Sequence, residues 1–157
     1  MATIEDIAAG IRRRDLSALM DLMFEDNPPR LRNGYGTEND LWDFKAGCPT
    51  PGRAHTVAWS ELAIDVLAFY NAKGGILIFG VDDRHVIKRT REHLDSKLFN
   101  DQIRKFVSDR IWVDFHRAFI SSDQRYVGIA VIPPRGPVLE RFHSDGPLVQ
   151  GVRRFKA

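Results

Sequence analysis

The sequence contains only one cysteine, Cys48, among its 157 residues. A single cysteine cannot form an internal disulfide, and it has no zinc-finger spacing with His55, His85 or His93, so neither a disulfide scaffold nor a structural zinc site is indicated. The N-terminus lacks the apolar core of a secretory signal, and no stretch approaches the roughly 20 apolar residues of a membrane-spanning helix. We therefore expect a soluble chain in the reducing cytoplasm, without a membrane partner.

A strong net charge is also missing, because 23 Lys and Arg nearly balance 21 Asp and Glu and leave +2. The total charge therefore does not by itself indicate a nucleic-acid partner. The basic side chains are nevertheless grouped, in residues 12–14, in residues 84–91 and in Arg153, Arg154 and Lys156 near the C-terminus. Such groups can hold phosphates, although a solvated basic face is the more common role.

Repeats and low-complexity segments are absent as well, and 157 residues that are 43% hydrophobic are enough for one core. The first 30 residues predict two short amphipathic helices, the first capped by Thr3 and the second starting at Asp15 and ended by Pro28 and Pro29. Helices this short are marginal alone. We expect this arm, residues 1–30, to fold back on the helix predicted over Thr56 to Ala72, or else to pack on a second copy or another protein.

Residues 31–157 predict one α+β domain with a mixed β-sheet and packed helices. Periodicity indicates a short strand in "DLWDFKA", a helix from Thr56 to Ala72, and a central strand from Ile76 to Val81 that is apolar on both faces. A second helix is expected from Ser96 to Arg110, with Leu98, Ile103, Phe106 and Val107 inward, followed by a hairpin of "WVDFHRAFI" with "RYVGIAVIPP". Short strands are expected near Val138 to His143 and Leu148 to Phe155, joined by a turn at Asp145 and Gly146.

A glycine pair, Gly74 and Gly75, invites comparison with a phosphate-binding loop. That loop lies between a strand and the start of a helix, where backbone amides point at the phosphate. Here the glycines follow a predicted helix, whose C-terminus carries a partial negative charge. We therefore expect the pair to end the helix in a left-handed conformation and to allow close backbone packing.

Acidic residues gather near two of the predicted strands. Asp82 and Asp83 follow the central strand, while Glu38, Asp40 and Asp43 lie in "ENDLWDFK", where Lys45 shares a strand face with Asp43. If the two strands are neighbours, several carboxylates meet at one edge and need a cation or a basic side chain. Plain surface acids, and a Lys45 that simply lies along the sheet, remain the alternatives.

Four segments together resemble the AlbA-like domain of the Schlafen family: "ENDLWDFK", "AFYNAKGGILIFGVDDR", "YVGIAVIPPRGPV" and "GVRRF". The resemblance covers roughly Gly36 to Arg154. It implies a nucleic-acid-binding domain, found alone or fused to other regions. In the Schlafen nucleases such a domain cleaves structured RNA, typically tRNA, with three carboxylates and Mg²⁺ or Mn²⁺.

Matched position by position, the resemblance places the metal-binding and catalytic carboxylates on Glu38, Asp43 and Asp83. The family usually has Glu where this chain has the shorter Asp43. Because Glu38 and Asp43 are five residues apart, an unbroken strand would put them on opposite faces, so Glu38 must precede the strand or lie beyond a bulge. Lys45 would neutralise a phosphate oxygen beside the metal. The expected contacts to the nucleic-acid backbone are Arg84, Lys88, Arg89 and Arg91.

The leading interpretation is therefore a nucleic-acid-binding domain with Mg²⁺- or Mn²⁺-dependent endoribonuclease activity on structured RNA such as tRNA, with RNA preferred over DNA. One alternative is a non-catalytic module that binds DNA or RNA, or a protein, and works with a partner or a fused domain. Another is a recruiting domain that contacts a partner through the arm. Because Schlafen cores pair two AlbA-like lobes, a single lobe is expected to dimerise or to work with a partner domain.

Overall fold

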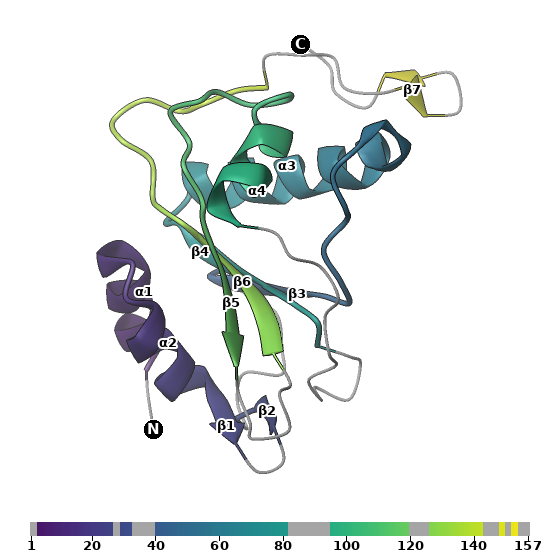
Figure 1. Cartoon of the computed structure of the whole chain (residues 1–157). Helices are drawn as coiled ribbons and strands as arrows, with labels where there is room; N and C mark the ends of the chain where they lie inside the picture. Colours follow the sequence, from purple (N-terminus) through teal and green to yellow (C-terminus); the bar gives the residue numbers. More distant parts are fainter. Residues whose placement is uncertain are drawn as a thin grey trace.

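The structure of the chain is a computed structural model, and it describes residues 3–26, 29–32, 40–81, 95–119, 126–142, 148–149 and 152–153. In this part of the chain, a four-stranded sheet lies between two pairs of helices (Figure 1). Two further two-stranded ribbons are not hydrogen-bonded to this sheet. This arrangement confirms the predicted α+β class.

The N-terminal arm begins with α1 (Ile4–Arg13) and α2 (Leu16–Met23). Thr3 and Asp6 form a reciprocal cap, in which the Thr3 hydroxyl accepts the Asp6 N–H at 3.2 Å and the Asp6 carboxylate accepts the Thr3 N–H at 2.8 Å. Asp15 caps α2 by accepting the Ala18 N–H at 3.1 Å. Both predicted helix starts are confirmed, because each follows from a local side-chain acceptor.

The second helix ends at Met23, earlier than the proline pair that was expected to end it. The chain continues as β1 (Phe24–Asp26), which pairs in antiparallel fashion with β2 (Pro29–Leu31). The sequence analysis did not predict this hairpin. Pro29 sits in an edge position of a two-stranded ribbon, where the missing backbone donor is tolerated.

The main sheet has the strand order β3-β4-β6-β5. Its strands are β3 (Trp42–Lys45), β4 (Gly75–Phe79), β5 (Asp114–Phe119) and β6 (Tyr126–Ile132). The β3 and β4 strands run parallel, and the connection between them contains the short 3-10 helix η1 (Arg53–His55) and α3 (Thr56–Asn71). The pairs β4/β6 and β5/β6 are antiparallel, which makes the sheet mixed and confirms the predicted hairpin.

Strand β4 is buried along its whole length, as its apolar sequence predicted. Ile76 and Ile78 belong to the hydrophobic core on the side of the arm, whereas Leu77 and Phe79 belong to the core under α3 and α4 (Ser96–Ile103). This alternation is the two-residue period of a strand with both faces covered. At its start, Gly74 ends the preceding helix with φ 79°, which confirms the predicted left-handed position.

The arm covers the face of the sheet opposite to α3 (Figure 1). Ile7, Ile11, Leu19 and Met23 are buried there in one core with residues of β4 and β6. The arm therefore folds back on its own chain, but the expectation that it would lie on the helix after residue 55 is wrong. A sheet that is apolar on both faces needs a second cover, and α3 and α4 already occupy the first face.

Helix α4 is shorter than predicted and presents a different face. It ends at Ile103 rather than Arg110, and the next residues form tighter turns in which the Phe106 N–H donates to the Ile103 carbonyl at 3.0 Å. Phe106 and Val107 are buried as expected, but Leu98 is 39% exposed and its neighbour Phe99 is buried instead. Phe99 packs edge-on against Trp59 and stacks on Phe115, and this aromatic contact determines the rotation of the helix.

The strands predicted after β6 are partly wrong. Residues 138–141 form no strand, and Val138 and Leu139 are exposed; only Phe142 makes an isolated bridge, to Val107. The segment predicted as one strand from Leu148 contains two short ones, β7 (Leu148–Val149) and β8 (Val152–Arg153), which pair with each other. The turn expected at residues 145–146 lies outside the described residues.

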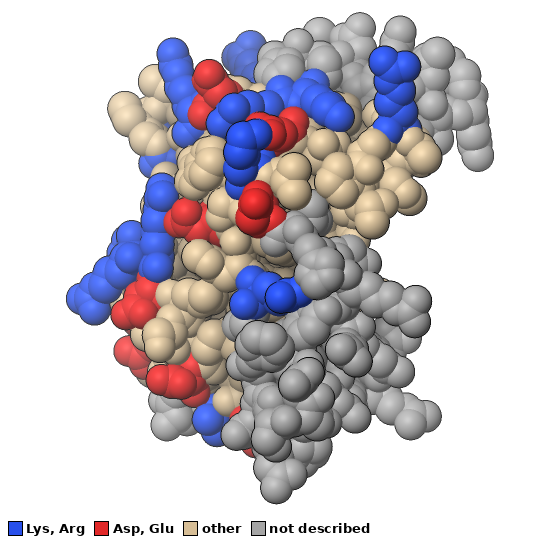
Figure 2. Space-filling view, viewed as in Figure 1, with Lys and Arg blue, Asp and Glu red and all other residues tan. Residues whose placement is uncertain are grey.

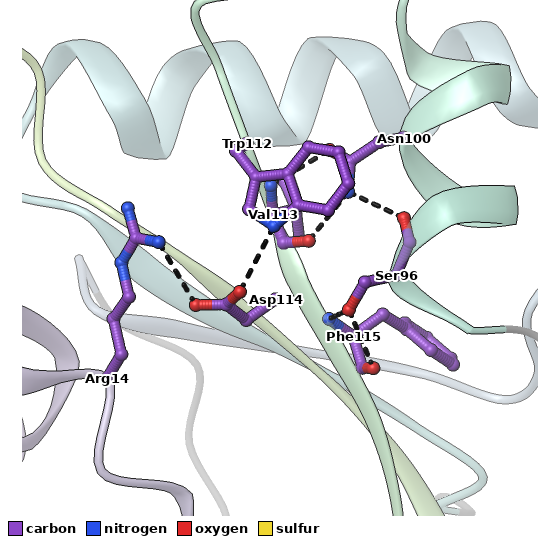
Figure 3. A network of polar contacts seen from close by, with 7 residues as sticks. All are labelled: Arg14, Ser96, Asn100, Trp112, Val113, Asp114 and Phe115. Carbon is purple, nitrogen blue, oxygen red and sulfur yellow. Dashed lines mark hydrogen bonds and ion pairs between the residues drawn. The ribbon is translucent and has the colours of Figure 1, made fainter.

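A polar network joins α4 to the outer edge of the β5 segment (Figure 3). The Asn100 side chain donates to the Val113 carbonyl at 2.7 Å and accepts the Val113 N–H at 2.9 Å, although Asn100 is only 1% exposed. Ser96 does the same for Phe115, accepting its N–H at 2.8 Å and donating to its carbonyl at 3.1 Å. These two side chains satisfy backbone groups that a neighbouring strand would otherwise pair with.

Replacement of Asn100 by Leu is expected to lower the free energy of unfolding by about 2–4 kcal/mol, because the buried N–H and carbonyl of Val113 both lose their partner. Urea unfolding with a shared m-value measures the loss. Gln102→Leu is the matched control on the same helix, since among described residues the Gln102 side chain bonds only the exposed Lys105, and a change within about 0.5 kcal/mol is expected. Equal losses in the two variants would contradict the role assigned to Asn100.

Candidate nucleic-acid site beside β3

Strand β3 places Asp43 and Lys45 on the side of the sheet that faces α3. Trp42 and Phe44 contribute to the core on the arm side, so the alternate residues point the other way. The Lys45 ammonium lies 3.2 Å from the Asp43 carboxylate. The prediction that these two residues share one face is therefore confirmed.

A third charged residue, Asp65, joins this pair from α3. Its carboxylate lies 2.9 Å from the Lys45 ammonium, which is closer than the Asp43 carboxylate. The sequence analysis missed Asp65. A signal for it exists in "LAIDVLAF" (residues 62–69), where Asp65 is the one charged residue in an otherwise apolar stretch of helix. We refer to Asp43, Lys45 and Asp65 together as the β3 cluster.

The β3 cluster is partly buried and has an excess of negative charge, since two carboxylates share one ammonium. Burial lowers the pKa of Lys45, but the hydrogen bonds and charges of Asp65 and Asp43 outweigh this effect and hold the pKa above its ordinary value. Lys45 is therefore positively charged at neutral pH. The other carboxylate oxygen of Asp43 accepts the Phe44 N–H at 2.8 Å, which fixes its orientation.

The β3 cluster opens into a groove of about 410 Å³ between β3 and the second half of α3. Asp40, Lys73 and the two carboxylates of the cluster supply its polar lining. Its apolar lining comes from Ala68, Phe69 and Ala72 at the end of α3, and from Trp42 of β3, whose side chain belongs to the core on the arm side. This size is within the range of ordinary ligand sites, and the groove places charged groups at one side of an apolar wall.

Most of the other predicted site residues lie outside the part of the chain that the structure describes. These residues are Glu38, Asp83, Arg84, Lys88, Arg89 and Arg91. Their placement relative to the β3 cluster therefore remains a prediction. Over the described ranges alone, no three or more His, Cys, Asp or Glu side chains are grouped so that they could hold a metal ion.

The described strands do meet two conditions of the predicted carboxylate site. First, β3 and β4 are neighbours, with Asp43 opposite Leu77 and Lys45 opposite Phe79. Second, β3 starts only at Trp42, and the chain bends at residues 40 and 41. A regular strand running from residue 38 to Lys45, which would have separated Glu38 from Asp43, is therefore not formed.

The basic and acidic side chains on the face shown in Figure 2 are interspersed, and they do not form one continuous basic patch. This agrees with the small net charge of +2. Along the residues that the structure describes, none of the helices has the length and the apolar character needed to cross a bilayer.

Comparisons with known proteins identify the fold and the family. A search of curated proteins found no match. Among solved structures, the DIP2311 protein of Corynebacterium diphtheriae is similar, with a TM-score of 0.52 and 17% sequence identity over 82% of this chain and 26% of that one. At this identity the likeness shows the fold alone, and the chain spans about a quarter of that protein's length.

The family model described as Schlafen, AlbA_2 matches residues 38–147, which include the β3 cluster, α3 and all four strands of the main sheet. The match starts after the arm. It ends before β7 and β8. The chain therefore belongs to the Schlafen AlbA_2 family, a membership that suggests a nucleic-acid-binding domain.

Proposed function

We propose that this chain binds structured RNA and cleaves it with Mg²⁺ or Mn²⁺, with Asp43, Glu38 and Asp83 as the ligands of the cation. The observation that carries the proposal is the contact between Asp43, which lines the groove between β3 and α3, and the charged Lys45 beside it. Family membership supports the nucleic-acid part of the proposal. RNA is favoured over DNA because its 2′-hydroxyl offers an internal nucleophile.

The chemistry of the described residues fits a hard divalent cation. Asp43 offers carboxylate oxygens, the ligands that Mg²⁺ and Mn²⁺ prefer, and Asp40 and Asp65 add negative charge in the same groove. A cation bound there would polarise the scissile phosphate and stabilise the charge that develops on it. Lys45 is charged at neutral pH and can pair with a phosphate oxygen, while Asp65 holds its ammonium near Asp43.

Recognition would rest on shape and on phosphate contacts, since side chains cannot read the deep major groove of A-form RNA. Arg84, Lys88, Arg89 and Arg91 are the proposed contacts to the backbone on one flank. We further propose that a second copy of the chain, or a partner domain, supplies the other wall of the RNA site, because this chain corresponds to one lobe.

Asp43→Asn is expected to lower cleavage of total tRNA in Mn²⁺ by more than about 100-fold, since the amide loses the charge that a ligand of a divalent cation needs. The melting temperature should remain nearly unchanged, because Lys45 keeps its contact with Asp65. Gel analysis of cleavage, with and without chelator, measures the effect. Asp109→Asn is the control, as Asp109 is an exposed carboxylate that lines neither the groove nor the cavity beside α1, and this variant should retain activity.

Cleavage by Asp43→Asn at the wild-type rate, or cleavage that persists in chelator, would refute the catalytic proposal. One observation favours the non-catalytic alternative: the ammonium of Lys45 already occupies a carboxylate oxygen of the shorter Asp43. Under that alternative, fluorescence anisotropy would detect RNA binding that Asp43→Asn leaves intact, and no cleavage would occur with either metal.

A further inference from the structure

A second cavity adjoins the groove beside β3. It has a volume of about 550 Å³ and lies where α1 meets the end of α3 and the loop after β6. Asp40 and Lys73 line both cavities, so the two are neighbours that share part of their lining between the β3 cluster and the arm. Ile4, Ala8, Leu41 and Pro134 form the apolar lining of the second part, which we call the arm cavity.

Two cations from different parts of the chain converge on the arm cavity. Arg12 comes from the last turn of α1, and Lys73 follows α3. Both side chains are exposed, and neither forms an ion pair with another residue in the described part of the chain. Figure 2 shows basic side chains on the flank where Figure 1 places α1.

The arm cavity differs in charge from the groove beside β3. Its cations, Arg12 and Lys73, are balanced by two carboxylates, those of Glu5 and Asp40. The groove beside β3 contains Asp40, Asp43 and Asp65 against Lys73 as lining residues. A polyanion that passes from the groove into the arm cavity therefore meets less negative charge, keeps its contact with Lys73 and gains one further cationic contact, Arg12.

We propose that the arm cavity binds a single-stranded segment of the RNA, which runs from the β3 cluster past Lys73 to Arg12. Cavities of about 410 and 550 Å³ are the size of small-molecule sites, which suits a few unpaired nucleotides and not a duplex. In this proposal the aliphatic lining contacts the bases without aromatic stacking, and the two cations bind phosphates. This inference rests on the proposed function, and it assigns RNA binding to Arg12, a residue outside the range matched by the family.

The test compares the binding of a fluorescein-labelled 12-nucleotide oligouridylate and of a 12-base-pair RNA duplex by the full-length chain, measured by anisotropy in chelator over a range of salt concentrations. Arg12→Ala and Lys73→Ala should each weaken binding of the single strand about 3- to 10-fold and reduce the magnitude of its salt slope by about 0.7. Duplex binding should change by less than about twofold. Arg13→Ala is the matched control, because Arg13 is the exposed neighbour of Arg12 and does not line the cavity.

The outcomes separate this inference from the proposed function. If the wild-type chain binds RNA but Arg12→Ala and Lys73→Ala leave the affinity for the single strand unchanged, the arm cavity does not bind the single strand. The proposed function then still stands. If Arg13→Ala lowers the affinity for the single strand as much as Arg12→Ala does, the effect comes from the general positive charge of α1 and not from the cavity. That result would also overturn the inference. A wild-type chain that binds neither RNA would refute the proposed function and the inference together.

Discussion

A chain that lacks residues 1–27 is expected to aggregate and to lose its cooperative unfolding transition. The deletion uncovers the arm side of the sheet, with Ile76, Ile78, Val127, Ile129 and Val131. Each of these side chains contributes about 1.5–3 kcal/mol by burial. Their sum is comparable to the whole net stability of an ordinary domain, about 5–15 kcal/mol. Size-exclusion chromatography and thermal unfolding by circular dichroism measure the outcome.

Point variants within the arm test the same contact without removing residues. Ile11 is fully buried in the core between arm and sheet, whereas Ile4, on the same helix, is 60% exposed. Ile11→Asp places an unpaired charge in that core and should unfold most of the protein, because such a charge has no partner there. Ile4→Asp should leave the melting temperature nearly unchanged.

A different result would favour the arm as a contact to other molecules. In that case the truncated chain would stay folded and soluble, would elute as a smaller assembly, and Ile11→Asp would be tolerated. A truncated chain that keeps both its stability and its assembly size would show that the arm has neither role. Either outcome would contradict the packing of Ile7, Ile11, Leu19 and Met23 on the sheet.

The second large effect is expected for Gly74→Ala, with a loss of about 2–5 kcal/mol in the free energy of unfolding. Gly74 has φ 79°, where an L-residue is strained, and its N–H donates to the Phe69 carbonyl at 2.8 Å to close α3. A Cβ at this position would lie 2.6 Å from the Ile132 carbonyl oxygen and 2.9 Å from the Pro134 nitrogen. Both are backbone atoms, so the clash cannot be relieved by a change of rotamer.

Two other glycines separate the contributions of strain and clash. A Cβ at Gly52 would meet nothing within 4 Å, but φ is 134°, so Gly52→Ala should cost only about 1–2 kcal/mol from strain. Gly136 also has open space around it and is not in the left-handed region, so Gly136→Ala should change stability by less than about 0.5 kcal/mol. Chemical denaturation ranks the three variants. A Gly74→Ala variant as stable as Gly136→Ala would refute the packing explanation of the glycine pair.

Several elements could be predicted from the sequence because their causes are local. Thr3 and Asp15 are side-chain acceptors that stand directly before helices, and each caps the helix that follows. Strand β4 is apolar at every position, which indicates a strand covered on both faces. Asp43 and Lys45 could be placed on one face of β3 because side chains in a strand repeat every two residues.

The elements that were predicted wrongly depend on contacts between distant segments. The rotation of α4 follows from the packing of Phe99 on Trp59 and Phe115, and no periodicity within the helix contains that information. The face that the arm covers depends on which face α3 and α4 already occupy. The strands after β6 are only two residues long, so the available partners decide whether they pair.

The same division applies to the candidate site. The sequence by itself determined that acidic residues and Lys45 lie near the ends of two strands, because residue types and the strand period are properties of a single segment. Only the tertiary structure decided that Asp65 holds Lys45 and that Arg12 and Lys73 share a cavity. The crossover through α3 brings Asp65 over β3, and the packing of α1 on the sheet brings Arg12 to the end of α3. Such positions arise from the packing of whole layers, which no single segment encodes.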